Sequence, residues 1–203
     1  MPTYHYLALG DSYTIGESVP ENDRWPMQLA KLLEADGIQT DLTIIARTGW
    51  TVKELWQGIQ ADAPIGTYDL VTLLIGVNDQ YRGYSTDGYR EDFRSILAKA
   101  TEYASGNANK VIVLSIPDWG VTPFAGDRDR EVVSHQIDIF NAINSEETKN
   151  AKAHYVDVTQ ISRMAKVDAE LIAEDGLHPS GKMYAMWAEH VLQVAKEILK
   201  PVL

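Results

Sequence analysis

Apolar residues are gathered into short continuous runs along the chain rather than alternating with polar ones. Five such runs stand out, at Tyr4–Leu9, Leu42–Ala46, Leu70–Ile75, Val111–Ile116 and Tyr155–Val158. Continuous runs of this length, rich in Val, Ile and Leu, are typical of parallel strands that are covered on both faces. We therefore expect five buried strands.

Between these runs, apolar residues recur at spacings of three and four, which predicts amphipathic helices. The expected helices are Pro26–Ala35, Val52–Ile59, Asp87–Ala104, Asp129–Asn144 and a last helix that starts at Pro179. Strands that alternate with helices predict βαβ units and a parallel sheet. The expected fold class is therefore α/β, a three-layer α/β/α sandwich around a flavodoxin-like parallel sheet of five strands in the order 2-1-3-4-5. No Gly/Ser-rich linker, repeat or low-complexity tract divides the chain, so residues 1–203 are expected to form a single domain.

The charge and composition narrow the range of partners. The net charge of −11 argues against binding to nucleic-acid backbones or anionic membrane surfaces, and mildly against a highly anionic substrate. The chain contains no cysteine, which excludes disulfides, thiolate metal sites and cysteine nucleophiles. No apolar run approaches the ~20 residues needed to cross a bilayer, so stable membrane insertion is not expected. The N-terminus lacks the pattern of a secretory signal, which favours a cytoplasmic location and leaves a processed exported form open.

Polar segments follow the first three expected strands where each strand ends. Gly10-Asp11-Ser12 follows the first strand, Arg47-Thr48-Gly49-Trp50 the second and Gly76-Val77-Asn78-Asp79 the third, and Asp175-Gly176-Leu177-His178 precedes the last helix. We expect all four segments to be loops. Ligands of open parallel sheets bind at the carboxyl ends of the strands, near the point where the strand order reverses. The fold is therefore expected to bring the four segments to one edge.

Three residues of these segments have complementary chemistry. The Ser12 hydroxyl is a poor nucleophile until a base accepts its proton, and an imidazole such as that of His178 suits this task. A tight turn can place Asp175, three residues earlier, where its carboxylate fixes the imidazole tautomer and stabilises the imidazolium. Gly10 is expected to make the turn that presents Ser12, and Asp11 to brace that turn through backbone amides.

Acyl transfer also requires hydrogen-bond donors that face the developing oxyanion. The sequence offers three candidates: the backbone amide of Ser12, the backbone amide of Gly49 and the side-chain amide of Asn78. Gly49 has no side chain to obstruct its N–H. These three residues are therefore the expected oxyanion hole.

The four segments, in this order, resemble the conserved blocks of the SGNH hydrolases, a branch of the GDSL esterases and lipases. The first block reads Gly-Asp-Ser-Tyr, with Tyr13 where the name-giving leucine would stand. Gly49 matches the second block, Asn78 the third, and Asp175 and His178 the last. Each motif is common by itself, so the specificity of the resemblance lies in their joint occurrence in the family order.

The resemblance implies a catalytic triad of Ser12, Asp175 and His178, and an oxyanion hole built from Ser12, Gly49 and Asn78. It extends over nearly the whole chain, because the blocks run from residue 10 to residue 178. Residues 1–203 are thus expected to form one SGNH-hydrolase-like domain. The implied chemistry requires no cofactor.

Other residues near the motifs are candidates for substrate contacts. Trp50, Trp119, Tyr81 and Arg47 are expected to line the cleft, with simple loop packing left open as the alternative for both tryptophans. Trp187 falls on the apolar stripe of the last helix and is expected in the core.

Residues Asp127-Arg128-Asp129 form a D-x-D pattern, but the Asx-Gly and the distal Glu of a calcium-binding loop are missing. We expect this segment to cap a helix, and we predict no metal site.

The expected function is a serine esterase that hydrolyses small carboxylic esters through an acyl-serine intermediate. No long lid insertion interrupts the elements, which favours short acyl chains. A carbohydrate O-acetylesterase, or a lysophospholipase or thioesterase of the same family, stays open. From another class, a non-catalytic α/β ligand-binding module also stays open. A phosphate-binding module is disfavoured, because the chain contains neither a G-x-G-x-x-G motif nor a P-loop.

Overall fold

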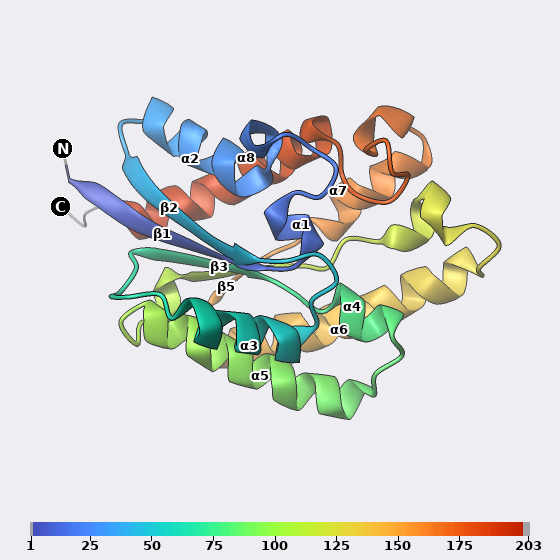
Figure 1. Cartoon of the computed structure of the whole chain (residues 1–203), viewed down its shortest axis with the longest axis horizontal. Coiled ribbons are helices and arrows are strands. Elements are labelled where there is room, and N and C mark those ends of the chain that lie inside the picture. The colour runs from blue at the N-terminus through green and yellow to red at the C-terminus, as the bar shows by residue number, and fades with distance from the viewer. Residues whose placement is uncertain (1, 201–203) are drawn as a thin grey trace.

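The computed structural model describes residues 2–200, and its centre is a sheet of five parallel strands (Figure 1). The strands are β1 (Thr3–Gly10), β2 (Gln39–Ala46), β3 (Leu70–Leu74), β4 (Val111–Leu114) and β5 (His154–Val156). Their order is β2-β1-β3-β4-β5. The predicted α/β class and strand order are therefore confirmed.

The pairing register aligns the carboxyl ends of β1, β2 and β3, the strands that precede the first three motif segments. Gly10 at the end of β1 pairs with Ala46 at the end of β2 and with Leu74 at the end of β3. The carboxyl ends of these three strands therefore lie level at one edge of the sheet. Every segment that leaves this edge starts within one strand spacing of its neighbour, which is about 4.8 Å.

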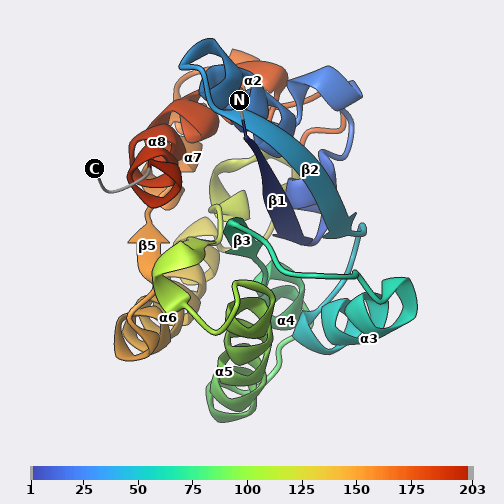
Figure 2. The same ribbon diagram turned by 90° about the vertical axis from the view of Figure 1, so that its left-hand side faces the viewer.

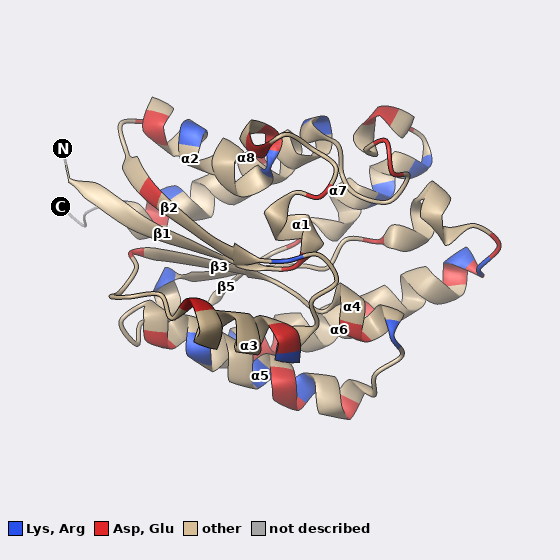
Figure 3. Ribbon diagram, in the orientation of Figure 1, with Lys and Arg blue, Asp and Glu red and all other residues tan. Residues whose placement is uncertain are grey.

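Helices cover both faces of the sheet. Figures 1 and 2 show α2 (Trp25–Ala35) and α8 (Gly181–Leu199) on one face, with α3 (Val52–Asp62), α5 (Thr86–Tyr103) and α6 (Arg130–Ala151) on the other. The charged residues lie mainly on the helices and loops, and the strands contain few of them (Figure 3). Burial of apolar strands between two helical layers stabilises the fold.

Helix α5 buries the apolar stripe that its sequence predicts. The buried side chains of α5 recur every three or four residues, at Tyr89, Phe93, Ile96, Leu97 and Ala100. Trp187 of α8 is fully buried, as expected for a core residue.

Three predicted helix boundaries were wrong by more than one residue, and the first is the end of α3, which continues to Asp62 rather than Ile59. The last helix begins at Gly181 rather than Pro179, because the Ser180 side chain caps it and Pro179 forms an isolated antiparallel bridge with Ile172. Helix α6 continues to Ala151 rather than ending at Asn144. Its last turns bury polar residues such as Glu147, so the apolar stripe that would have revealed them is missing.

Several short helices lie outside the predicted elements. The α-helical ones are α1 (Ser12–Ile15), α4 (Val77–Tyr81) and α7 (Thr159–Arg163). The 3-10 helices are η1 (Glu21–Asp23), η2 (Ala108–Lys110), η3 (Trp119–Val121), η4 (Pro123–Ala125), η5 (Met164–Lys166) and η6 (Ala169–Leu171). Ser12 and Asn78 were expected in loops, but they lie in the first turns of α1 and α4. Between residues 2 and 200, none of the helices has the length and apolarity that a membrane span requires.

Candidate active site

Ser12 lies at the start of α1, directly after the end of β1. The Asp11 carboxylate accepts a 3.0 Å hydrogen bond from the backbone N–H of Tyr13 and so caps this helix. A Cβ atom on Gly10 would lie 2.2 Å from Thr14 Oγ1 and 2.6 Å from the Leu74 carbonyl oxygen. Only glycine fits at this turn, and the turn places Ser12 at the edge of the sheet.

Asp175 and His178 are joined through their side chains. Oδ2 of Asp175 lies 2.6 Å from Nδ1 of His178, and Oδ1 accepts hydrogen bonds of 2.9 Å from the amides of Leu177 and His178. Ser18 Oγ donates a further bond of 2.7 Å to Oδ2. Burial by itself would raise the pKa of Asp175, but these bonds, with the His178 ring first among them, lower it to about 2. The carboxylate is therefore ionised at neutral pH and accepts a hydrogen bond from the Nδ1–H group of His178.

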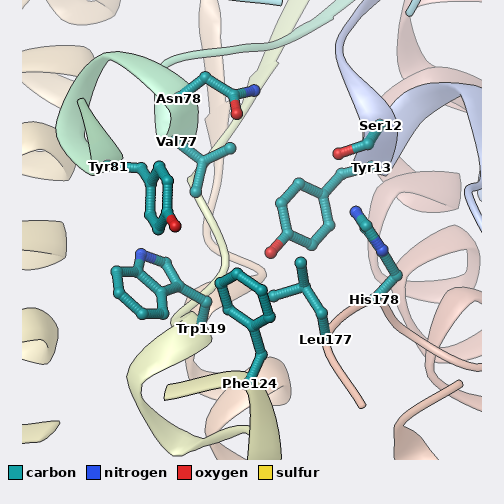
Figure 4. A pocket seen from close by; sticks show the side chains of 9 residues that line it. All are labelled: Ser12, Tyr13, Val77, Asn78, Tyr81, Trp119, Phe124, Leu177 and His178. Carbon is teal, nitrogen blue, oxygen red and sulfur yellow. The ribbon is translucent and has the colours of Figure 1, made fainter. Parts of the chain in front are cut away.

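Ser12 and His178 line the same cavity. Figure 4 shows the Ser12 hydroxyl directed into it, and shows the ring nitrogen of His178 that is not bonded to Asp175 turned toward Ser12. Among residues 2–200 no hydrogen bond joins the two side chains. Rotation about χ1 moves the serine hydroxyl, and catalytic hydrogen bonds of this kind shorten when substrate binds.

The three expected oxyanion donors leave the neighbouring ends of β1, β2 and β3. In the described part of the chain, neither the Ser12 amide nor the Gly49 amide has a hydrogen-bond acceptor. Gly49 has a φ of 82°, a left-handed conformation that favours glycine. Nδ2 of Asn78 donates a 2.9 Å bond to the Trp50 carbonyl oxygen, which fixes the side-chain amide and leaves its second N–H free. Ser12 and Asn78 line the cavity. Gly49 is placed near Asn78 because the Asn78 side chain bonds to the carbonyl oxygen of Trp50, the next residue in the sequence.

An arginine that the sequence reading missed holds the Gly49 loop. Nη2 of Arg82 donates a 2.7 Å bond to the Gly49 carbonyl oxygen, and Nη1 lies 3.2 Å from Oε2 of Glu54. Glu54 also accepts bonds from the amide and hydroxyl of Thr51 in the capping box of α3. The segment after β3 therefore supports the segment after β2 through both Asn78 and Arg82.

Two buried carboxyl groups flank the candidate residues. Burial raises the pKa of Asp11 to about 8. The hydrogen bond from the Tyr13 amide lowers this pKa, whereas the nearby Asp79 carboxyl raises it further. Burial likewise raises the pKa of Asp79 to about 7, against a 3.1 Å bond from the Val52 amide. Both side chains are fully buried and neither lines the cavity. The bond of Asp11 lies within the segment after β1, and the bond of Asp79 joins the segment after β3 to the start of α3.

The cavity is mostly apolar. It is lined by Ser12, Tyr13, Val77, Asn78, Tyr81, Trp119, Phe124, Leu177 and His178. Two of the expected substrate contacts, Tyr81 and Trp119, are among these residues. Trp50 and Arg47 are not.

Trp50 packs instead on α3, where a Cβ atom on Gly58 would lie 2.1 Å from its indole ring. Arg47 is exposed on the loop after β2. Tyr13, Val77, Phe124 and Leu177 were not expected in the cavity. Three of them directly adjoin a motif residue in the sequence: Tyr13 adjoins Ser12, Leu177 adjoins His178 and Val77 adjoins Asn78. This adjacency is the sequence signal that could have identified Tyr13, Leu177 and Val77.

Residues 127–129 form a helix cap as predicted. The Asp129 carboxylate accepts hydrogen bonds from the amides of Glu131 and Val132 at the start of α6. In the range 2–200, no group of three or more His, Asp or Glu side chains is arranged to hold a metal ion.

The sequence itself matches a family model. Residues 8–186 fit the model of the GDSL-like lipase/acylhydrolase family, and this range contains all four motif segments. The chain belongs to this family. It is therefore a hydrolase of the GDSL/SGNH type, a family of carboxylic ester hydrolases, as the resemblance implied. A search of curated proteins finds no match to the chain.

Solved structures share the fold of this GDSL-family chain over nearly its whole length. TesA has a TM-score of 0.74 and 21% identity, with 96% of this chain and 99% of TesA covered. Axe2, an acetylxylan esterase from Geobacillus stearothermophilus, has a TM-score of 0.71 and 19% identity, with 95% and 94% covered. The esterase EstA from Pseudoalteromonas, in a structure inhibited by monoethylphosphonate, has a TM-score of 0.66 and 17% identity, with 96% and 97% covered.

Proposed function

We propose that this chain is a serine esterase that hydrolyses carboxylic esters of short acyl chains, with Ser12, His178 and Asp175 as its catalytic triad. The observation that carries the proposal is the 2.6 Å contact between Asp175 Oδ2 and His178 Nδ1, with the other ring nitrogen turned toward Ser12. Membership of a family of ester hydrolases supports the same conclusion.

In the proposed reaction, Ser12 Oγ attacks the ester carbonyl carbon while His178 Nε2 accepts its proton. The ionised Asp175 carboxylate stabilises the imidazolium that forms. The oxyanion accepts hydrogen bonds from the Ser12 and Gly49 amides and from the free N–H of Asn78. The carbon–oxygen bond to the alcohol then breaks, and His178 gives its proton to the leaving alkoxide.

The acyl-Ser12 intermediate is hydrolysed by the same groups in the second half of the cycle. Water attacks the acyl carbon while His178 accepts one of its protons. When the bond to Ser12 breaks, His178 returns that proton to Oγ, and the carboxylic acid leaves. The enzyme ends in its starting protonation state.

The size of the cavity supports a short acyl group. Its volume is about 90 Å³, space on the order of a few water molecules. Its apolar walls suit a hydrocarbon substituent rather than a charged one.

An O-acetylated carbohydrate is the second candidate substrate. Trp119 and Tyr81 offer aromatic faces within the cavity, and Axe2, which shares the fold, acts on acetylxylan. A panel that includes acetylated xylo-oligosaccharides beside simple acetate and butyrate esters distinguishes the two.

The test of the proposed function is the Ser12→Ala variant beside wild type on p-nitrophenyl acetate and butyrate. We expect kcat/KM to fall by at least about 10³-fold, because the nucleophile is removed. Ser95→Ala, which changes an exposed serine on α5, serves as the matched control and should retain wild-type activity. Equal turnover by Ser12→Ala and wild type would refute the proposal.

A further inference from the structure

One wall of the cavity at Ser12 consists of three aromatic rings from three different segments. Tyr81 belongs to α4, Trp119 to η3 and Phe124 to η4. The ring centroids lie 5.4 Å apart for Tyr81–Trp119, 6.0 Å for Tyr81–Phe124 and 5.9 Å for Trp119–Phe124 (Figure 4). The shape of this wall therefore depends on what holds the three segments together.

The three rings differ in how firmly they are fixed. Trp119 is 4% exposed, and its Nε1 donates a 2.8 Å hydrogen bond to Oε1 of Gln80. Tyr81 and Phe124 are 45% and 41% exposed. The inner ring is thus anchored by burial, whereas the two outer rings depend on contacts at the surface.

Arg128 supplies such a contact to all three rings. Its guanidinium carbon lies 5.0 Å from the ring centroid of Tyr81, 5.2 Å from that of Trp119 and 5.7 Å from that of Phe124. Nη2 also donates a 3.0 Å hydrogen bond to the Tyr81 hydroxyl. A guanidinium over an aromatic face is attracted to the partial negative charge of that face, which arises from the ring quadrupole.

No ion pair accounts for the position of Arg128. Within residues 2–200 it forms no salt bridge. The neighbouring Asp129 carboxylate is bonded to the amides of Glu131 and Val132 as the cap of α6. The aromatic wall is therefore the main partner of the Arg128 side chain.

The segment that carries Phe124 and Arg128 is also tied to the loop of the candidate triad. The amide of Phe124 donates a 2.9 Å bond to the carbonyl oxygen of Gly176, which follows Asp175 in the sequence. The amide of Arg128 donates a 3.0 Å bond to the Ala125 carbonyl oxygen. Residues 123–128 therefore connect the Asp175–His178 loop to α4 and Tyr81.

We propose that Arg128 determines the acyl-chain specificity of the enzyme. Its guanidinium holds the rings of Tyr81 and Phe124 against Trp119, closes the outer end of the cavity at Ser12 and limits the acyl group to a few carbons. The inference rests on the proposed function, since it takes this cavity to receive the acyl group of an ester.

The experiment compares kcat/KM for p-nitrophenyl acetate, butyrate and octanoate in wild type, Arg128→Ala, Arg128→Lys and Phe124→Ala. We expect Arg128→Ala to raise the ratio of kcat/KM for octanoate to kcat/KM for acetate about five- to tenfold. The substitution removes the cation that contacts all three rings, so the outer end of the cavity opens to a longer acyl chain. Arg128→Lys should raise it less, since a lysine keeps the charge but not the planar group. Phe124→Ala should raise it as well. Lys149→Ala removes one positive charge near the far end of α6 and should leave the ratio at its wild-type value.

Melting temperatures verify that the variants are folded. A ratio that is the same in Arg128→Ala and wild type overturns the inference. An equal loss of activity on all three esters also overturns it, because Arg128 would then be a general support of the site. A wild type without Ser12-dependent hydrolysis of any ester would refute the proposed function itself, a result distinct from both.

Discussion

Ser18 Oγ donates a 2.7 Å hydrogen bond to Oδ2 of Asp175, the same oxygen that lies 2.6 Å from Nδ1 of His178. Ser18 has a φ of 63°, a left-handed conformation that is uncommon for serine. It lies shortly after α1, the helix that begins with Ser12. The segment that presents the candidate nucleophile therefore also fixes the candidate acid of the triad, although 157 positions separate Ser18 from Asp175 in the sequence.

Replacement of Ser18 by alanine should lower kcat/KM for p-nitrophenyl acetate about fivefold. The variant removes one of the donors that hold the Asp175 carboxylate, a contribution on the order of 1 kcal/mol for a partly exposed bond. Ser18→Gly is the matched control for backbone strain, because glycine accepts the positive φ without cost. Both variants should lose activity to a similar extent. Wild-type activity in Ser18→Ala would contradict the role assigned to the hydroxyl.

Replacement of Arg82 by glutamine should lower kcat more than it raises KM. The bond from Arg82 to the Gly49 carbonyl oxygen positions a loop whose free amide is a proposed oxyanion donor, and that donor acts mainly in the transition state. We expect a loss of about tenfold or more in kcat, measured by steady-state kinetics. Lys53→Ala removes a nearby cation that pairs with Asp92 and should have little effect. A change confined to KM would rule out this role.

Asp175→Asn should reduce kcat by about 10²- to 10⁴-fold while the protein stays folded. The asparagine retains the shape of the side chain but carries no charge to stabilise the imidazolium of His178. In wild type, the hydrogen bonds to Asp175 lower its pKa to about 2, compared with ~3.9 in the unfolded chain. The ionised Asp175 therefore stabilises the folded protein fully above pH ~3.9, and this stabilisation is lost as the pH falls toward 2. Kinetics at neutral pH check the first statement, and thermal melts of both proteins from about pH 5 down to about pH 2 check the second. An Asp175→Asn enzyme with full activity would exclude Asp175 from the triad.

The buried Asp79 carboxyl should make the protein less stable as the pH rises. Its pKa is about 7 in the folded chain and ~3.9 in an unfolded one, so the folded state binds the extra proton between these values. The free energy of unfolding should therefore decline from about pH 4 to pH 7, by at most about 1.4 kcal/mol per pH unit for this group. Asp79→Asn cannot ionise and should show a shallower decline.

Urea unfolding at pH 5, 6, 7 and 8 measures this difference in slope. Asp62→Asn, which changes an exposed carboxylate at the end of α3, is the control and should follow the wild-type curve. Parallel curves for wild type and Asp79→Asn would show that Asp79 does not hold a proton in the folded chain.

The sequence predicted the sheet and the edge where the motifs meet, because both depend on local pattern. Continuous apolar runs mark β1, β3 and β4 as buried strands, and βαβ order then fixes their direction. The pair Asp175 and His178 was predicted for the same reason. The two residues are three positions apart, and a tight turn over that distance brings their side chains together. In the structure, Asp175 Oδ2 and His178 Nδ1 lie 2.6 Å apart.

The supporting residues could not be predicted, because they act across the fold rather than along the chain. Arg82 bonds to Gly49 over a separation of 33 residues, and no motif marks it as the partner of that loop. The sequence pattern marks Arg128 only as part of a helix-capping segment, because its contacts with three rings depend on how η3, η4 and α4 pack. Trp50 adjoins Gly49, the candidate oxyanion glycine, in the sequence, yet its side chain packs on α3.

Labelling by a fluorophosphonate probe tests the central claim most directly. The probe forms a covalent bond to an activated serine, and intact-protein mass spectrometry with peptide mapping locates that bond. We expect one adduct per chain, on Ser12, that is lost in Ser12→Ala and strongly slowed in His178→Ala, while Ser95→Ala labels like wild type. No adduct on folded wild-type protein, or an adduct on another residue, would contradict a Ser12 nucleophile activated by His178.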